Sequence, residues 1–324
     1  MINTCTKLPG THIQTEIDEW TKMNQLKLVE EQYTTILIDY WREHHKQLPH
    51  IMNFSGGRSS AMLTLELAKN RQLNPERGDI ILFANTSAEH PATYTFANQV
   101  CDEIEGTYQI PCLWFEFTTA ERYTMKKWRR YATYKLVNRH KKATPDDDPS
   151  YPGYHDDGSV FEHLISWKFR MPDRRARLCT QYMKIAPNLH LLQDWLSGQP
   201  TTPPQGENLT PQAEPPDEYR EYCFTTPPSR PAQTWADFSP VAKPPNYQPV
   251  DFWKVGNPTE MVKILGLRSD EPKRVARMEE RNLLSEGAGS KACQDKQQPP
   301  GEHIYSPLAT SHVRKHHVLS LIHI

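Results

Sequence analysis

The chain lacks long apolar runs and has almost no net charge. No stretch of its 324 residues approaches the ~18 consecutive apolar residues of a transmembrane helix, so we expect no membrane partner. The first 20 residues contain no apolar segment of the secretory type, and we expect a cytoplasmic protein. A formal net charge of −1 excludes a protein that coats nucleic acid through its overall charge.

Cysteines are few and dispersed. The six are Cys5, Cys101, Cys112, Cys179, Cys223 and Cys293, and no two of them form a CxxC pair. This spacing argues against a disulfide scaffold and agrees with a reducing compartment. The chain is long enough to bury a core without such crosslinks.

Short apolar runs alternate with helical patterns along most of the chain. We predict strands at 51–54, 79–84, 111–117 and 261–266, and helices at 61–69, 93–105, 121–130, 270–281 and from about 184 through 196. Strands that are apolar throughout are typical of a parallel sheet that is covered on both faces. We therefore expect an α/β fold with a doubly wound, mainly parallel, Rossmann-like sheet.

Composition divides the chain into four segments. Residues 1–48 are predicted as an N-terminal helical extension, because apolar residues recur at helical spacing from Leu26 to His45. Residues 49–198 form the first part of the α/β domain. Residues 199–250 contain 13 of the 28 prolines, which predicts a long insertion with little regular structure. Residues 251–324 continue the domain, which we expect to be truncated at its C-terminal end.

The sequence FSGGRSSA at residues 54–61 is the sharpest motif. It places two glycines between a predicted buried strand and the start of a helix. Glycines allow a close backbone approach to a ligand, and the free N–H groups of a helix start attract anions. The motif is neither a GxxxxGK[ST] loop nor GxGxxG. Its alternative interpretation is an ordinary glycine-rich turn between strand and helix.

Five stretches in order resemble one family. They are SGGRSSA at 55–61, FANTSAEHPATY at 83–94, RLCTQYMKIAP at 177–187, LGLRSDEPKRVARM at 265–278 and IYSPLA at 304–309. Together they resemble the phosphoadenosine phosphosulfate (PAPS) reductase family, especially its divergent phage and prophage members. This family belongs to the PP-loop adenine nucleotide α-hydrolases. The resemblance implies an adenine nucleotide α-hydrolase type of fold and an adenine nucleotide ligand.

The resemblance also assigns roles to individual residues. The nucleotide and its phosphates would be held by Ser55, Gly56, Gly57, Arg58, Ser59, Ser60, Asn85, Thr86, Glu89 and Arg274. Arg58 stands where many such loops have Asp, and Ser87 replaces a glycine of the family pattern. Other interpretations stay open: a solvated side chain for Arg58 and Arg274, and a helix N-cap for Asn85 and Thr86.

The catalytic candidates are Cys179, Lys184 and Arg268. Arginines at 174, 175 and 177 and Lys184 give Cys179 an electropositive setting that favours a thiolate. Alternatively, Cys179 is a small buried apolar residue. The resemblance implies that this cysteine pairs with later cysteines in a metal or iron–sulfur site. That later segment and the family's C-terminal nucleophilic cysteine are both absent from this sequence, so we expect an iron–sulfur cluster only in a more complete chain.

Residues 121–142 mix basic and aromatic side chains, a composition that suits a nucleic-acid surface. The alternative is a solvated helix whose aromatic residues pack inward. His140, His155 and His163 show no metal-ligand spacing, so we name no metal ligands. A Mg²⁺ ion accompanying the nucleotide is compatible with the site.

The sequence therefore predicts a PAPS reductase-like oxidoreductase or transferase that acts on a sulfate or phosphate anhydride of PAPS or ATP. One alternative is an ATP pyrophosphatase that activates an acceptor for thiolation or nucleic-acid sulfur modification. The other is a non-catalytic module that binds nucleotide or nucleic acid. The sequence does not identify a redox partner.

Overall fold

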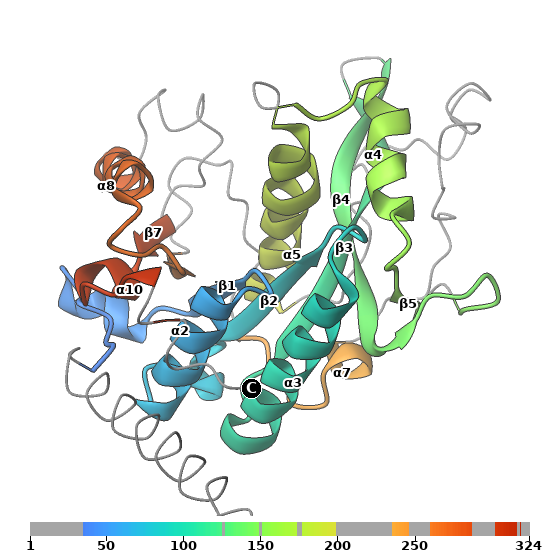
Figure 1. The fold of residues 1–324 in the computed structure, drawn as a ribbon. Helices are drawn as coiled ribbons and strands as arrows, with labels where there is room; N and C mark the ends of the chain where they lie inside the picture. Colours follow the sequence, from blue (N-terminus) through green and yellow to red (C-terminus); the bar gives the residue numbers. More distant parts are fainter. Residues whose placement is uncertain are drawn as a thin grey trace, which may run out of the picture.

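A computed structural model of the chain describes residues 35–124, 127–148, 151–173, 177–198, 235–245, 260–286, 302–315 and 318. Within these ranges, strands form one sheet in the order β5-β4-β3-β2-β1-β6-β7 (Figure 1). The strands are β1 (His50–Phe54), β2 (Ile80–Asn85), β3 (Cys112–Thr124), β4 (Lys127–Lys142), β5 (Gly153–Tyr154), β6 (Met261–Leu265) and β7 (Glu302–Tyr305).

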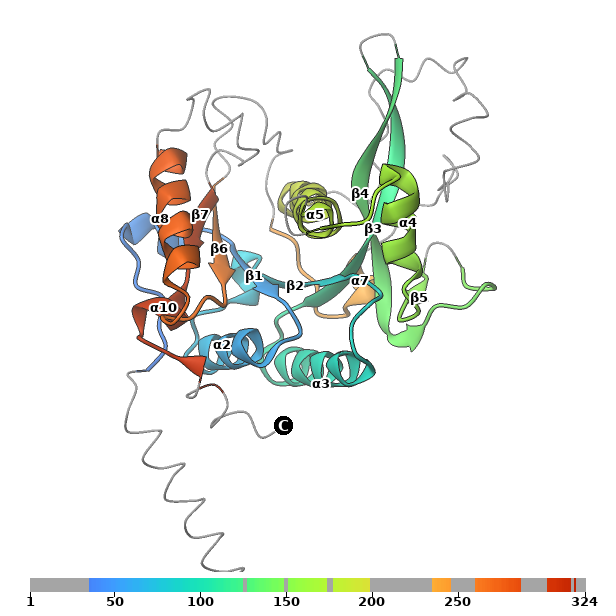
Figure 2. The same cartoon turned by 45° about the horizontal axis from the view of Figure 1, so that its top comes forward.

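All neighbouring strands run parallel except β3 and β4, which form an antiparallel hairpin. Helices α2 (Arg58–Lys69) and α3 (Pro91–Tyr108) lie on one side of the sheet, and α5 (Ala186–Ser197) lies on the other (Figure 2). The expected α/β fold with a mainly parallel sheet is confirmed.

Helices cover both faces of the sheet, which explains the uniformly apolar strands. In β1, Met52 packs in the cluster that includes α2 and α3, whereas Ile51 packs with α5. In β2, Ile81 and Leu82 divide in the same way. Because successive side chains of a strand point to opposite faces, a strand buried on both faces needs apolar residues at every position.

The sheet reverses its winding between β1 and β6. Helix α2 follows β1, and α8 (Pro272–Glu286) follows β6. Helix α8 packs on Leu265 and Ile304, whereas Ile264 and Tyr305, which alternate with them, belong to the α2 side. Neighbouring strands whose helices leave to opposite faces open a crevice at their carboxyl ends, where ligands bind in doubly wound folds.

The predicted helix from Leu26 to His45 is wrong in its described part. Residues 35–40 have no regular secondary structure, and only a 3-10 helix, η1 (Glu43–Gln47), follows; residues 26–34 lie outside the described ranges. Ile36 and Ile38 are buried while Leu37 between them is exposed. This alternation is that of an extended segment, which the helical spacing of the neighbouring apolar residues obscured.

The predicted helix at 121–130 is also wrong, because this segment forms the end of β3 and the start of β4. The segment contains Tyr123, Thr124 and Trp128, and residues of these types favour strands. Part of the predicted insertion also differs from expectation. Trp235 and Phe238, in the short helix α7 (Trp235–Phe238), are buried, and the Trp235 ring packs edge-on against Trp195 at 5.1 Å. The rest of the insertion, 199–234 and 246–250, lies outside the described residues.

The remaining described helices are α4 (Ser159–Lys168), the π-helix η3 (Cys179–Ile185), η2 (Pro75–Arg77) and α10 (Pro307–Thr310). The helix expected from about residue 184 is confirmed as η3 and α5 together. Among the described residues, none of the helices combines the length and the apolar character needed to cross a membrane.

Candidate functional site

The turn after β1 depends on Gly56. This residue has φ of +71°, a left-handed backbone that glycine adopts without strain. A Cβ at this position would lie 2.9 Å from ring atoms of Phe83 and 2.9 Å from the methyl group of Thr93. Gly57 has an extended backbone, and a Cβ there would meet only Ser55 Oγ at 3.4 Å. The turn therefore requires the first glycine, whereas the second leaves open the space beside the loop.

Ser60 holds the loop from inside. Its side chain is buried, and its hydroxyl donates to the Gly57 carbonyl at 2.9 Å. The same oxygen accepts from the Ser55 N–H at 3.2 Å, and the two serine hydroxyls are 2.9 Å apart. Because the single Ser60 proton goes to Gly57, the Ser55 hydroxyl donates to Ser60. Ser60 thus shapes the loop, while Ser55 is exposed.

The first turn of α2 has no side-chain cap. Gly57 occupies the N-cap position and cannot supply one. The Ala61 N–H bonds back to the Gly57 carbonyl at 3.0 Å, but the N–H groups of Arg58, Ser59 and Ser60 precede the first helical acceptor. Unpaired N–H groups and the positive end of the helix dipole together suit an anion.

Arg268 reaches this turn from the neighbouring strand. It follows β6, and its Nη1 donates to Ser59 Oγ at 3.1 Å. Gly266 makes this approach possible, because a Cβ there would lie 3.3 Å from the backbone of Ser60. The Arg268 side chain is 22% exposed, so part of it remains accessible beside the loop. Arg268, a catalytic candidate from the sequence, therefore lies at the glycine loop.

Two carboxylates orient Arg268. Its Nε donates to Asp270 at 2.9 Å, and its Nη2 lies 3.7 Å from Glu271. Burial alone would raise the pKa of Asp270, but the hydrogen bond and charge of Arg268 outweigh burial and lower it. Glu271 also accepts from the Arg268 N–H at 3.2 Å and from Arg274. Arg274 itself is exposed and pairs with Glu271, which agrees with the interpretation of a solvated side chain.

The side-chain amide of Asn85 forms its hydrogen bonds within the protein. It is fully buried at the end of β2, and its amide nitrogen donates to Glu116 at 2.8 Å and to the His155 carbonyl at 2.7 Å. Its oxygen accepts from the Ser87 N–H at 2.9 Å and from the Tyr94 hydroxyl at 3.1 Å. All four hydrogen-bonding positions of the amide are therefore occupied.

The residues after Asn85 also have local partners. Thr86 is buried and donates to Glu89 at 3.1 Å. The N-cap of α3 is His90, which accepts from the Ala92 N–H, so the alternative interpretation of Asn85 and Thr86 as N-caps of this helix is wrong. Ser87 has a left-handed backbone, with φ of +59°, and its hydroxyl accepts from the Val160 N–H at the start of α4.

The buried carboxylate of Glu116 lies beside Asn85 and was not predicted from the sequence. Glu116 lies opposite Asn85 in the β2–β3 pairing and is fully buried. His155 Nδ1 lies 2.8 Å and Lys135 Nζ 3.3 Å from its carboxylate. Burial by itself would raise the pKa of Glu116, but hydrogen bonds from His155 and the charge of Lys135 outweigh it and lower the pKa. The sequence did offer a signal for this residue, because Glu116 is the acidic residue within the otherwise apolar strand predicted at 111–117.

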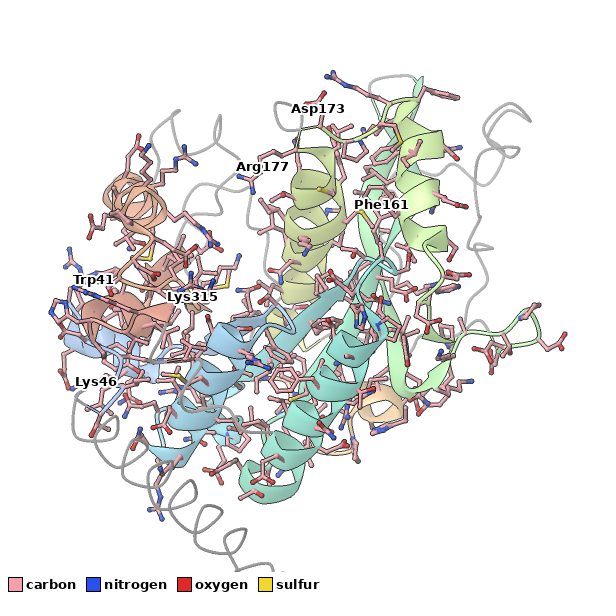
Figure 3. All side chains as sticks on the ribbon, viewed as in Figure 1. Trp41, Lys46, Phe161, Asp173, Arg177 and Lys315 are labelled. Atoms are coloured by element: carbon pink, nitrogen blue, oxygen red, sulfur yellow. The ribbon has the colours of Figure 1, made fainter. Side chains whose placement is uncertain are left out.

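Cys179 and Lys184 both lie on the π-helix η3, which leads into α5. Figure 3 shows Arg177, two residues before Cys179, beyond the upper end of α5, and Phe161 on α4. Cys179 is half-buried in a cluster that includes Phe161 and Phe117, and Lys184 is exposed on the same π-helix. Of the three sequence-predicted catalytic candidates, Arg268 is the one whose hydrogen bond to the glycine loop is seen in the described part of the chain. Lys184 lies one helical turn before Asn188, whose amide nitrogen donates to Asn53 of β1 at 3.1 Å, so this helix reaches the strand that precedes the loop.

Of the described cysteines, Cys101 and Cys112 lie close enough to interact, and Cys179 lies apart from them. Cys101 and Cys112 are buried in the core on the α2 and α3 side, whereas Cys179 lies in the cluster beneath α4. Cys5, Cys223 and Cys293 lie outside the described residues. Within the described part of the chain, the residues present do not form an iron–sulfur site.

Several basic residues of 121–142 have acidic partners. The pairs are Lys135 with Glu116, Arg139 with Asp102 and Glu105, Lys141 with Asp147 and Lys142 with Asp156. Arg139 is also almost completely buried. These pairs leave less positive charge for a nucleic acid than the composition alone indicates.

Comparison of the sequence with models of known protein families found no match, and comparisons with curated proteins and with solved structures found none either. The resemblance noted in the sequence therefore rests on its motifs alone.

Proposed function

We propose that this chain binds an adenine nucleotide where β1 and β6 end, and acts on a sulfate or phosphate anhydride of that nucleotide. The observation that carries the proposal is the hydrogen bond from Arg268 to Ser59, which joins the two loops at the reversal of the sheet. A guanidinium held against an uncapped helix start provides charge and N–H donors at one place. The resemblance to the PAPS reductase family supplies the nucleotide class.

The chemistry follows from the same groups. Cleavage of an anhydride leaves negative charge on the departing phosphate or sulfate. The N–H groups of Arg58, Ser59 and Ser60 are fixed by the helix, and Asp270 and Glu271 hold the Arg268 guanidinium in place. Donors that are oriented before the reaction stabilise the developing charge without reorganisation. Arg58 is exposed at the helix start and could extend this positive surface.

A second candidate reaction is cleavage of ATP between the α and β phosphates to activate an acceptor. The setting of Cys179 favours it, because this residue packs among the apolar side chains of the cluster that contains Phe117 and Phe161. In this reaction the loop and Arg268 suffice to hold the pyrophosphate, and the acceptor supplies the nucleophile.

Anaerobic incubation with ATP and PAPS separately, with dithiothreitol as the electron donor, distinguishes the reactions. Sulfite from PAPS supports a sulfonucleotide reductase, and pyrophosphate from ATP supports the second candidate. Nucleotide binding without either product would indicate a binding module. Absence of binding to both nucleotides would contradict the proposed function.

The first prediction concerns Arg268 and its neighbour Arg274. Arg268→Ala should weaken nucleotide binding about 10- to 100-fold, because a charge-assisted hydrogen bond contributes about 1.5–3 kcal/mol. Arg274→Ala removes an exposed arginine that pairs with the same Glu271, and should leave affinity within about twofold. Isothermal titration with each nucleotide measures both. Equal losses in the two variants would show that general positive charge, not the position of Arg268, holds the ligand.

A further inference from the structure

Two histidines and a glutamate meet at the end of the sheet where β1 and β6 begin. The glycine loop lies at the opposite end, where β1 finishes. His44 and His45 lie on η1, and Glu260 immediately precedes β6. One ligand atom from each of the three lies within 4.8 Å of the other two, and His44 Nε2 is 3.2 Å from a Glu260 oxygen. The segment that carries η1, marked by Trp41 and Lys46 in Figure 3, reaches this edge, where the Trp41 ring stacks on Tyr305 of β7 at 4.0 Å.

His45 has a nitrogen without a partner. The residue is fully buried, and its Nδ1 is 2.7 Å from the Tyr305 hydroxyl. Its Nε2 is also buried, and no described group bonds it. A buried polar atom without a hydrogen bond is destabilising, so its presence needs an explanation.

We propose that His44, His45 and Glu260 bind a divalent transition-metal ion of the Zn²⁺ type. Imidazole and carboxylate ligands suit such ions, whereas Mg²⁺ and Ca²⁺ prefer oxygen ligands alone. The hydrogen bond between Tyr305 and His45 Nδ1 fixes the ring and leaves Nε2 for the metal, as neighbours of metal-bound histidines commonly do. Three protein ligands leave a further coordination position for water.

His303 on β7 contacts two of the proposed ligands, His45 and Glu260. Its ring stacks on that of His45 at 3.9 Å, and its Nε2 lies 3.5 Å from Glu260. Stacked rings do not direct their nitrogens at one point, so His303 is a positioning residue here and not a fourth ligand. A metal at this place would join the segment before β1 to β6, and β7 would hold its ligands. It would stabilise the fold far from the glycine loop, so the proposal does not depend on the proposed function.

The test uses the untagged full chain after chelator treatment, with ZnSO₄ as the probe in isothermal titration. We expect one equivalent of Zn²⁺ to bind, no binding of Mg²⁺, and a higher melting temperature with Zn²⁺. Glu260→Gln and His44→Ala change half-buried and exposed side chains that the fold should tolerate. Each should weaken Zn²⁺ binding at least about tenfold, because loss of a partner beyond the ligands already costs 10- to 100-fold.

His140→Ala is the matched control, because His140 is exposed on β4 and far from the cluster in sequence. It should leave Zn²⁺ affinity and the rise in melting temperature unchanged. The chain also has histidines near its end, at 312, 316, 317 and 323, which could bind Zn²⁺ independently. Zn²⁺ bound equally by the wild type, His44→Ala and Glu260→Gln would therefore overturn the proposal, as would the absence of binding.

Discussion

The loop after β1 and the loop after β2 end neighbouring parallel strands at the same edge of the sheet, but their polar groups are used differently. After β1, the first N–H groups of α2 have no helical acceptor, and Arg268 stays partly exposed beside them. After β2, Asn85 fills all four of its hydrogen-bonding positions, and Glu116 is held by His155 and Lys135. The resemblance gave both loops a role in binding the nucleotide.

The polar groups of the β1 loop can therefore bind a ligand, whereas those of the β2 loop support the structure around it. A ligand gains hydrogen bonds from donors that lack partners, whereas a satisfied buried amide must first break the bonds it has. We therefore expect the β1 loop to provide affinity and the cluster of Asn85, Glu116 and His155 to keep the β2 loop in position. The predictions below test that division.

The largest effect should come from Glu116→Ala. Removing the carboxylate leaves Lys135, the His155 side chain and the Asn85 amide without their buried acceptor. Loss of one partner from a buried charge pair typically costs about 3–5 kcal/mol. Urea denaturation should show this loss in the free energy of unfolding. Glu103→Ala, at an exposed position on α3, is the control and should change it by less than about 0.5 kcal/mol.

Measuring the nucleotide affinity of Glu116→Ala tests whether the β2 loop takes part in binding. Under conditions in which Glu116→Ala stays folded, we expect affinity to fall by less than about fivefold, because the residue does not belong to the β1 loop. A large loss of affinity in a folded variant would mean that the buried cluster takes part in binding, and the division between the two loops would fail.

The two glycines provide a smaller and sharper test. Gly56→Ala should lose about 2–4 kcal/mol of stability, because the new methyl group would strain a left-handed backbone and meet Phe83 and Thr93. Gly57→Ala should keep stability within about 1 kcal/mol, because it meets only Ser55 Oγ at an ordinary distance. If Gly57→Ala nevertheless abolishes nucleotide binding, a ligand occupies the space beside the loop. Thermal unfolding and titration measure the two effects, and unimpaired binding by Gly57→Ala would count against a ligand at this loop.

The order of strands and helices around β1, β2 and the first half of β3 could be predicted because local apolar runs and glycines determine these elements. The β3–β4 hairpin could not, since its mixed charged and aromatic residues also fit a helix, and only pairing with the partner strand decides between the two. Residues 35–40 were misjudged because burial by distant core residues, and not helical spacing, sets their conformation.

The candidate site was predictable only as far as its motifs. The glycine loop and Arg268 stood out in sequence, and the structure brings them together. Motifs do not show whether a side chain has partners, so Asn85 looked like a ligand-binding residue although Glu116 and His155 satisfy it. The same reason hid His44 and Glu260, which are 216 residues apart and meet only through the pairing of β1 with β6.

The smallest predicted effect concerns a half-buried carboxylate for which no ion pair is seen among the described residues, in contrast to Glu116. Asp194 on α5 accepts a hydrogen bond from Tyr134 at 2.5 Å, and burial raises its pKa to about 7 despite that bond. The unfolded chain loses this proton near the usual pKa of 3.8. Between about pH 4 and 7 the folded state binds more protons than the unfolded state, so stability falls as pH rises.

Asp194→Asn cannot ionise, and its amide oxygen can still accept from Tyr134. The variant should therefore lose less stability than the wild type between pH 5 and pH 8, by about 1–2 kcal/mol after allowance for partial solvent screening. Urea denaturation at several pH values measures the difference. Parallel pH profiles for the two proteins would show that Asp194 ionises freely in the fold, and a buried carboxylate would then not need the cations that surround Glu116.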